Sequence, residues 1–132
     1  IDQPFVTNTL SFRDEREFPV VPDGEVRILA LGDSITAGVG VAAEHTYVRQ
    51  LESLLNGREM PVRVINAGVA GYGVWQELDR LNEKRGLVNP HIIMLQVYWN
   101  DLYPKPATVS VPTRCSKELA ARMSSANRNA GW

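Results

Sequence analysis

Ser34 is the residue whose type and position most directly suggest chemistry. It follows Gly32 and Asp33 at the end of an apolar run, residues 26–31, which has the composition of a buried parallel strand. Open α/β sheets bind their ligands at the carboxyl ends of such strands. A serine hydroxyl placed there acts as a nucleophile when a positioned base takes its proton. The alternative is an ordinary strand-to-helix turn, in which Asp33 or Ser34 only caps the helix.

Two later segments place further small and polar residues after predicted strands. Residues 62–66 form the second predicted strand, which ends at Asn66 and runs into a glycine-rich segment. Residues 91–97 form the third, which runs into Tyr98-Trp99-Asn100-Asp101. All three predicted strands are apolar and read as buried. Because parallel strands end at one edge of a sheet, we expect these polar residues to face the same rim as Ser34.

The order Gly-Asp-Ser, Asn-x-Gly-x-x-Gly and x-x-Asn-Asp, each after a predicted strand, resembles the SGNH (GDSL-type) hydrolase family. The resemblance covers residues 8–101, and three weak motifs in the same order make a strong signal. It implies an ester hydrolase in which Ser34 is the nucleophile. It also implies an oxyanion hole made of the backbone N–H groups of Ser34 and Gly71 and the side-chain amide of Asn100. Such donors stabilise the negative charge that acyl transfer builds on the carbonyl oxygen.

Other polar residues are expected to support this site. Asp33 is expected to order the turn around Ser34 by accepting bonds from local backbone N–H groups. Asp101 is expected to do the same beside Asn100, and Asn66 is expected to fix the loop that leads to Gly71.

Three nearby side chains have less specific expectations. Thr36 is expected to cap or brace the helical turn after Ser34. Trp75 and Trp99 have two interpretations, because a tryptophan near a pocket can line it but is more commonly buried in packing.

The sequence departs from the family pattern at two points. Family members usually have glycine where this chain has Tyr98, so the pocket is expected to be reshaped there. The family also completes its triad with a C-terminal Asp-x-x-His block, whereas no aspartate follows Asp101 and no histidine follows His91. We interpret His45 as a surface or helix-start residue and His91 as a strand-entry residue, so neither is assigned as the base.

Strands that alternate with helical segments predict an α/β fold, doubly wound, with a parallel sheet between two helical layers. Helices are predicted over residues 46–56, ending at Gly57, and over residues 74–85, ended by Gly86 and Pro90. Their predicted core-facing residues are Val48, Leu51, Leu54, Leu55, Val74, Leu78 and Leu81.

Three strands are fewer than the family usually has, so the sheet is expected to be incomplete and to leave an edge uncovered. The first residue is Ile1 rather than Met, which favours a piece of a longer protein. We divide the chain into a lead-in segment (1–25), an α/β core (26–103) and an atypical polar tail (104–132) that contains Cys115. Within the lead-in, residues 8–14 resemble the segment that precedes the first motif in some bacterial members.

Composition excludes several classes of function. The net charge is −1 and the charges are scattered, so nothing favours nucleic acid or an anionic membrane as a partner. No apolar run is long enough to span a bilayer, and one cysteine excludes an internal disulfide framework. No zinc-type spacing, phosphate loop or dinucleotide fingerprint occurs, so no metal or cofactor is predicted. Charged residues of the second helix are predicted to form a solvated face: Glu77, Asp79, Arg80, Glu83, Lys84 and Arg85.

Three hypotheses of different classes follow. The first is a serine ester hydrolase acting on small acyl or acetyl esters, including those of carbohydrates, whose His/Asp block lies outside this sequence. The second is an inactive relative that keeps the pocket to bind such ligands. The third is a truncated product with no function of its own. The resemblance favours an extracytoplasmic location, which the sequence itself leaves undetermined.

Overall fold

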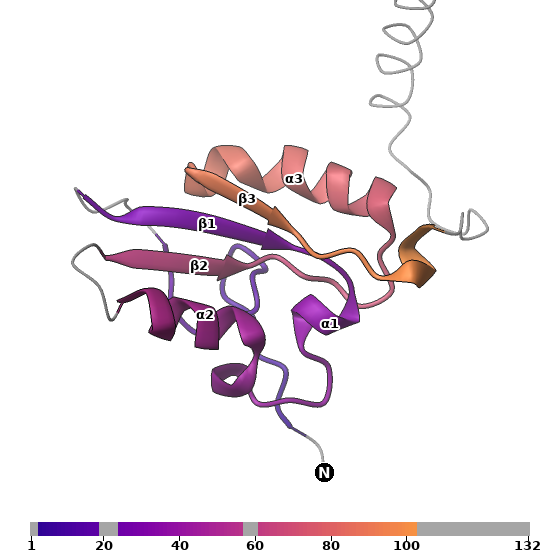
Figure 1. Cartoon of the computed structure of the whole chain (residues 1–132), viewed down its shortest axis with the longest axis horizontal. Helices are drawn as coiled ribbons and strands as arrows, with labels where there is room; N and C mark the ends of the chain where they lie inside the picture. Colours follow the sequence, from indigo (N-terminus) through magenta and orange to yellow (C-terminus); the bar gives the residue numbers. More distant parts are fainter. Residues whose placement is uncertain (1–2, 19–23, 57–60, 103–132) are drawn as a thin grey trace, which may run out of the picture.

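The computed structural model describes residues 3–18, 24–56 and 61–102, and gives only the backbone at positions 100 and 102. Three parallel strands form one sheet in the order β2-β1-β3 (Figure 1). They are β1 (Val26–Leu31), β2 (Val62–Asn66) and β3 (Ile92–Leu95). In the central register, Leu29 of β1 lies opposite Ile65 of β2 and Ile93 of β3. The predicted parallel α/β fold is therefore confirmed.

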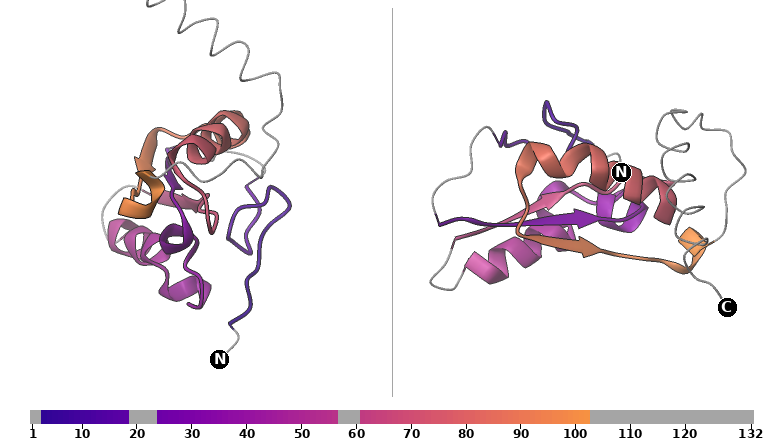
Figure 2. Two further views of the ribbon diagram at one scale, coloured as in Figure 1. Left: turned by 90° about the vertical axis from the view of Figure 1, so that its right-hand side faces the viewer. Right: turned by 90° about the horizontal axis from the view of Figure 1, so that it is seen from above.

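Two helices cover the sheet, one on each face (Figure 2). They are α2 (Tyr47–Asn56), which connects the neighbouring strands β1 and β2, and α3 (Val74–Val88), which connects β2 to β3 on the other side of β1. Shorter helical segments are α1 (Ser34–Ala37) and the 3₁₀ turns η1 (Ala43–His45) and η2 (Trp99–Leu102). The start of α3, α1 and η2 gather at the carboxyl ends of the strands, on the right of Figure 1.

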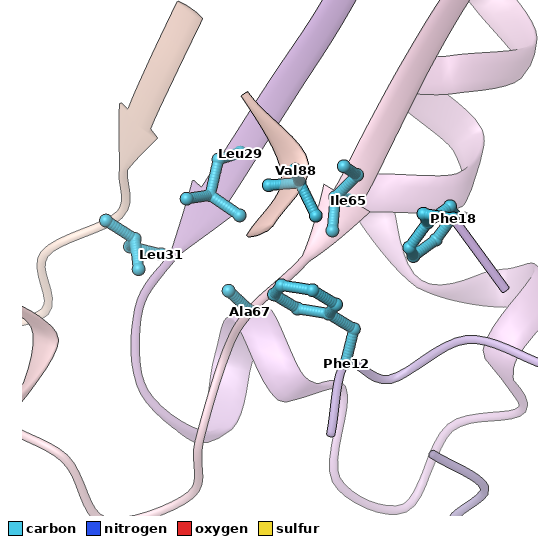
Figure 3. Packing of buried hydrophobic residues seen from close by; sticks show 7 residues of the cluster. All are labelled: Phe12, Phe18, Leu29, Leu31, Ile65, Ala67 and Val88. Atoms are coloured by element: carbon cyan, nitrogen blue, oxygen red, sulfur yellow. The ribbon is translucent and has the colours of Figure 1, made fainter. Parts of the chain in front are cut away.

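Strand alternation divides the buried residues into two clusters. On the face of α2, Ile28, Ala30 and Val64 of the sheet pack against Val48 of the helix. On the other face, the sheet packs against α3 and the N-terminal segment (Figure 3). This second cluster contains Phe12, Phe18, Leu29, Leu31, Ile65, Ala67 and Val88. Residues 8–18 are thus more than a lead-in, because their two phenylalanines complete one hydrophobic face of the sheet.

The second helix is longer than predicted. It continues past Gly86 to Val88, because the Val88 side chain is fully buried in the second cluster. The helix ends at Asn89, which adopts the left-handed conformation at φ 45° and donates its N–H to the carbonyl of Arg85. Asparagine is one of the few residues that takes this conformation readily at a helix end. The third strand is shorter than the predicted 91–97, and α2 starts one residue after the predicted position 46.

Some predicted core positions were wrong. Leu54 is 74% exposed on α2, and Leu78 is also exposed on α3. On α3, Glu77 and Lys84 are buried although Leu78 is exposed. The prediction of a solvated charged face was therefore wrong for Glu77 and Lys84. The Lys84 ammonium lies 6.0 Å from the centre of the Phe12 ring and 2.7 Å from the Glu83 carboxylate. Because the N-terminal segment packs against α3, part of a helix face that carries charged residues is buried.

The two outer edges of the sheet differ. On the outer side of β2, Asn56 bonds both the N–H and the carbonyl of Val62, and the Glu52 carboxylate accepts the N–H of Val64. Arg13 donates its backbone N–H to the Asn66 carbonyl at the end of the same edge. Polar groups from α2 and from the N-terminal segment thus close the β2 edge.

No segment of the described chain pairs with the outer side of β3. Its side chains are half exposed, at 50% for Ile92, 49% for Ile93 and 46% for Leu95. The prediction that the third strand is buried was therefore wrong, whereas an uncovered edge was expected. Gly57 and residues 104–132, with Cys115, lie outside the described residues.

Candidate active site

Ser34 is the first residue of α1 and is partly exposed at the end of β1. The chain turns through Gly32, whose φ is 155°, and through Asp33. One Asp33 carboxylate oxygen accepts the N–H of Ile35 at 2.9 Å, so Asp33 is the N-cap of α1. The Ser34 hydroxyl lies 3.5 Å from the other oxygen, which is a long contact.

A partly buried polar network underlies this turn. The Thr36 hydroxyl lies 2.9 Å from the Tyr47 hydroxyl of α2. The Gln96 amide nitrogen, oriented to pair with acceptors, donates to Thr36 Oγ1 at 3.1 Å and to Asp33 Oδ1 at 3.3 Å. Burial raises the pKa of the Tyr47 phenol, and the nearby Asp33 charge adds to this effect. The network connects the Ser34 turn to α2 and to the end of β3.

The loop after β2 is bonded directly to the turn that carries Ser34. The Asn66 side chain donates to the Thr36 carbonyl at 2.7 Å and accepts the N–H of Gly68 at 3.0 Å. The N–H of Val69 bonds the Gly32 carbonyl at 3.0 Å. A Cβ at Gly68 would lie 2.7 Å from the Thr36 carbonyl carbon and closer still to the next backbone nitrogen, so only glycine fits. The loop then reaches Gly71, whose φ is 84°.

The segment after β3 lies close to the loop that carries Gly71. Asp101 is buried, and its carboxylate accepts the N–H of Tyr98 at 2.6 Å, while its own N–H bonds the Tyr98 carbonyl. A Cβ at Gly73, the N-cap of α3, would lie 3.2 Å from the Asp101 carbonyl oxygen. The η2 turn that contains Asn100 therefore packs against the backbone just after Gly71.

The structure thus brings most of the sequence-predicted site residues to one edge of the sheet. Backbone contacts join the segments that carry Ser34, Asn66 and Gly71, and a backbone contact joins the last of these to the turn that carries Asn100. Trp75 and Trp99 are 67% and 64% exposed at this edge, so burial in the core was the wrong interpretation for both. Tyr98 is exposed there as well.

Neither histidine is brought to Ser34. His91 lies at the start of β3, where its Nδ1 accepts the N–H of Arg27 at 3.1 Å and its own N–H bonds the Arg27 carbonyl. This is the opposite end of the strands, so its interpretation as a strand-entry residue is confirmed. His45 is exposed at the end of η1, and in the described part of the chain no hydrogen bond joins it to Ser34.

Sequence reasoning missed three residues that shape the site, namely Arg13, Tyr47 and Gln96. Tyr47 and Gln96 complete the network around Thr36, and Arg13 donates to carbonyls at the end of α1. No local pattern marks them, because each contacts residues far away in the sequence. The one available signal was the similarity of residues 8–14 to a bacterial lead-in.

Comparison with known proteins decides the family. The model described as "GDSL-like Lipase/Acylhydrolase family" matches residues 30–130, which is most of the chain. The chain belongs to the GDSL-like lipase/acylhydrolase family. A comparison with curated proteins finds no match.

Solved structures agree with this assignment to the GDSL-like family. TesA matches with a TM-score of 0.53 and 28% identity, over 57% of this chain and 42% of its own. AlinE4, described as an SGNH-hydrolase family esterase, matches with a TM-score of 0.50 and 26% identity, over 80% of this chain and 55% of its own. A mutant of the same esterase reaches 31% identity with a TM-score of 0.50, over 59% of this chain and 42% of its own. The chain therefore spans about half the length of these GDSL-like relatives.

The described residues of this GDSL-like chain show neither a metal-binding cluster nor a membrane-spanning helix. No group of three or more His, Cys, Asp or Glu side chains is placed to hold a metal ion there. Among the same residues, no helix combines the length and the apolar character needed to cross a membrane.

Proposed function

We propose that this chain carries the nucleophile and oxyanion-binding part of a serine ester hydrolase. In this proposal the Ser34 hydroxyl oxygen attacks the ester carbonyl carbon and gives its proton to a base. The tetrahedral intermediate then expels the alcohol, which takes the proton, and leaves an acyl group on Ser34. Water repeats the sequence and releases the carboxylic acid.

The negative charge on the carbonyl oxygen would be stabilised by three donors. We assign them as the backbone N–H groups of Ser34 and Gly71 and the side-chain amide of Asn100. Removing one such donor in a comparable hydrolase lowers kcat by about 10²–10³. The tryptophans at positions 75 and 99, exposed at the same edge, offer apolar surface to an acyl or sugar group.

The direct bonding between the first two motif segments is the observation that carries this proposal. The Asn66 side chain and the Val69 N–H both bond to the Gly32–Thr36 turn, so the Gly71 loop has a fixed relation to Ser34. Membership of the GDSL-like family supports the reaction class, and AlinE4 is described as an esterase. Small acyl or acetyl esters, including those on carbohydrates, are the proposed substrates.

The proposal requires a base that Ser34 does not meet in the described structure. His91 is at the wrong end of the strands, and His45 has no bond to the nucleophile turn. We assign the base to a histidine supplied from outside this sequence, as the family's Asp-x-x-His block would supply it. By itself, this chain is expected to turn over esters slowly or not at all.

The absence of a base at Ser34 among the described residues favours one second candidate. A site with an oxyanion pocket but no proton acceptor would bind acylated ligands without hydrolysing them. Turnover by a protein that includes the missing block would exclude this second candidate.

Fluorophosphonate labelling followed by intact-mass measurement tests the main proposal. We expect one adduct, mapped to Ser34, because the oxyanion donors also stabilise the charged phosphonyl oxygen. Ser34→Ala should abolish it, whereas Ser53→Ala, at an exposed serine of α2, should leave it unchanged. An adduct that persists in Ser34→Ala would contradict the assignment of Ser34 as the nucleophile, as would the lack of any adduct on a folded protein that includes the Asp-x-x-His block.

A further inference from the structure

We infer that Arg13 is a positioning residue that holds the nucleophile helix α1 against the Gly71 loop. This inference rests on the proposed function, because it gives the N-terminal segment a role in the same site. Arg13 comes from a stretch that precedes the first motif and lies outside residues 30–130, which the family model matches.

The Arg13 guanidinium contacts the far end of α1. It donates to the carbonyl oxygens of Ala37, Gly38 and Val41, and the residue is only 4% exposed. The Phe5 ring covers it, with 4.5 Å between the guanidinium carbon and the ring centre. Burial lowers the Arg13 pKa, but arginine stays charged in proteins. A buried cation is thus placed on three backbone acceptors.

These acceptors need a partner because of how α1 ends. The helix has four residues and stops at Gly38, which is in the left-handed conformation at φ 64°. The Gly38 N–H bonds back to the Ile35 carbonyl, but carbonyls in the last turn of a helix have no partner within it. The planar guanidinium can bond several of them at once and also complements the negative end of the helix dipole.

Arg13 is itself fixed to the loop that carries the proposed oxyanion donor. Its backbone N–H donates to the Asn66 carbonyl at 3.0 Å. The Asn66 side chain in turn donates to the Thr36 carbonyl of α1 at 2.7 Å. A closed ring of bonds therefore runs from Arg13 to Asn66, from Asn66 to α1, and from α1 back to the Arg13 side chain.

The rest of the N-terminal segment keeps Arg13 in place. Asn8 accepts the backbone N–H groups of Leu10 and Phe12 with its side-chain oxygen, and Phe12 is fully buried in the core. Arg13 therefore starts from a fixed backbone position. If its side chain is shortened, α1 loses its brace at the end opposite Ser34.

Arg16 offers a matched control from the same segment. Its guanidinium bonds the carboxylates of Asp14 and of Glu52 on α2, and it makes no hydrogen bond to α1. Arg13→Lys and Arg16→Lys both keep the positive charge and lose the planar fork. Only the first removes bonds to the nucleophile helix.

The experiment measures two quantities on the full chain, at a temperature where circular dichroism shows that each variant is folded. The first is the rate constant for fluorophosphonate labelling of Ser34, and the second is the amide chemical shifts of Ser34 and Gly71. We expect Arg13→Lys to label at least about ten-fold more slowly, since small misplacements of reacting groups cost rate steeply. In Arg13→Lys, the amide resonances of Ser34 and Gly71 should both shift from their positions in the parent chain. Arg16→Lys should stay within about two-fold of the parent rate, because the geometry that sets this rate is unchanged.

A further variant separates positioning from general stability. In Arg13→Ala, added methylguanidinium should restore part of the labelling rate and return the amide shifts toward those of the parent chain. Parent-like labelling and shifts in Arg13→Lys would overturn the inference, as would equal losses in Arg16→Lys. If the parent chain itself is not labelled, Ser34 is not activated without the missing base, and the amide shifts alone decide the role of Arg13.

Discussion

The Asn66 side-chain amide donates to the carbonyl oxygen of Thr36 across 2.7 Å, and both residues are almost completely buried. One residue is at the end of β2, and the other is in the helix that begins with Ser34. The side-chain oxygen of Asn66 also accepts the N–H of Gly68. The Asn66 side chain therefore ties the loop of the second motif to the helix that begins with Ser34.

Replacing Asn66 tests how much this tie stabilises the fold. Asn66→Ala leaves a buried carbonyl and a buried N–H without partners, so we expect a loss of about 1–3 kcal/mol in the free energy of unfolding. Asn56→Ala is the matched control, because Asn56 also bonds backbone groups but at an exposed position. Urea titrations should show the larger loss for Asn66→Ala, and the reverse order would contradict this account.

Two glycines should respond to alanine in opposite directions. At Gly68 a Cβ would collide with the backbone of α1, so Gly68→Ala is expected to destabilise the fold by about 2 kcal/mol or more. At Gly86, inside α3, a Cβ meets nothing within 4 Å. Gly86→Ala should stabilise the chain by about 0.5–1 kcal/mol, because alanine loses less backbone entropy in a helix. Thermal and urea unfolding of the two variants would check both signs.

The raised Tyr47 pKa predicts a dependence of stability on alkaline pH. An unfolded tyrosine ionises near about pH 10, whereas burial holds the Tyr47 phenol neutral to higher pH in the native state. As the pH rises past about 10, the unfolded chain loses this proton first and stability falls. Below that value the contribution of Tyr47 is fully present.

Tyr47→Phe isolates this effect. The variant should be less stable than the parent at pH 8, because it loses the bond to Thr36. The difference should narrow between about pH 10 and the native pKa, because only the parent carries the phenol that titrates there. Urea unfolding at a series of pH values measures the difference in the free energy of unfolding between the parent and Tyr47→Phe. A difference that stays constant with pH would mean that Tyr47 has the same pKa in the native and unfolded states.

The β3 edge, which no segment of the described residues covers, predicts self-association. Exposed strand edges with apolar side chains pair readily with other chains. Ile93→Lys should therefore reduce the sedimentation coefficient at high protein concentration. Leu54→Lys changes a more exposed leucine on α2, away from this edge, and should have no such effect. Equal sedimentation coefficients for Ile93→Lys and Leu54→Lys would indicate nonspecific hydrophobic association rather than edge pairing.

Local sequence patterns were enough to predict how the turn at Ser34 is built. A β-branched run followed by Gly-Asp-Ser leaves few local conformations, and Asp33 caps α1 by bonding the N–H of Ile35. The ends of β1 and β2 and the whole parallel fold follow from the same kind of short-range pattern. The catalytic roles of Ser34, Gly71 and Asn100 stay predictions.

Residues that depend on distant partners could not be predicted in this way. Leu78 has helical spacing with Leu81, yet it is exposed and Lys84 is buried, because Phe12 and its segment pack on α3. The burial of β3 was overestimated because a strand's own composition does not show whether a neighbour covers it. Arg13 was missed because its acceptors at Ala37 and Gly38 come much later in the chain.

The placement of Arg13 also has a consequence for the order of events during synthesis. The ribosome makes the segment that carries Arg13 before the sheet, but Arg13 finds its acceptors only when α1 and the end of β2 have emerged. Until then, Phe12 and Phe18 have no sheet to cover. Non-local contacts of this kind delay folding and leave apolar side chains accessible. Residues 12–18 are therefore translated before the sheet but are among the last to reach their final packing, and a nascent chain stopped before Asn66 would present both phenylalanines to chaperones.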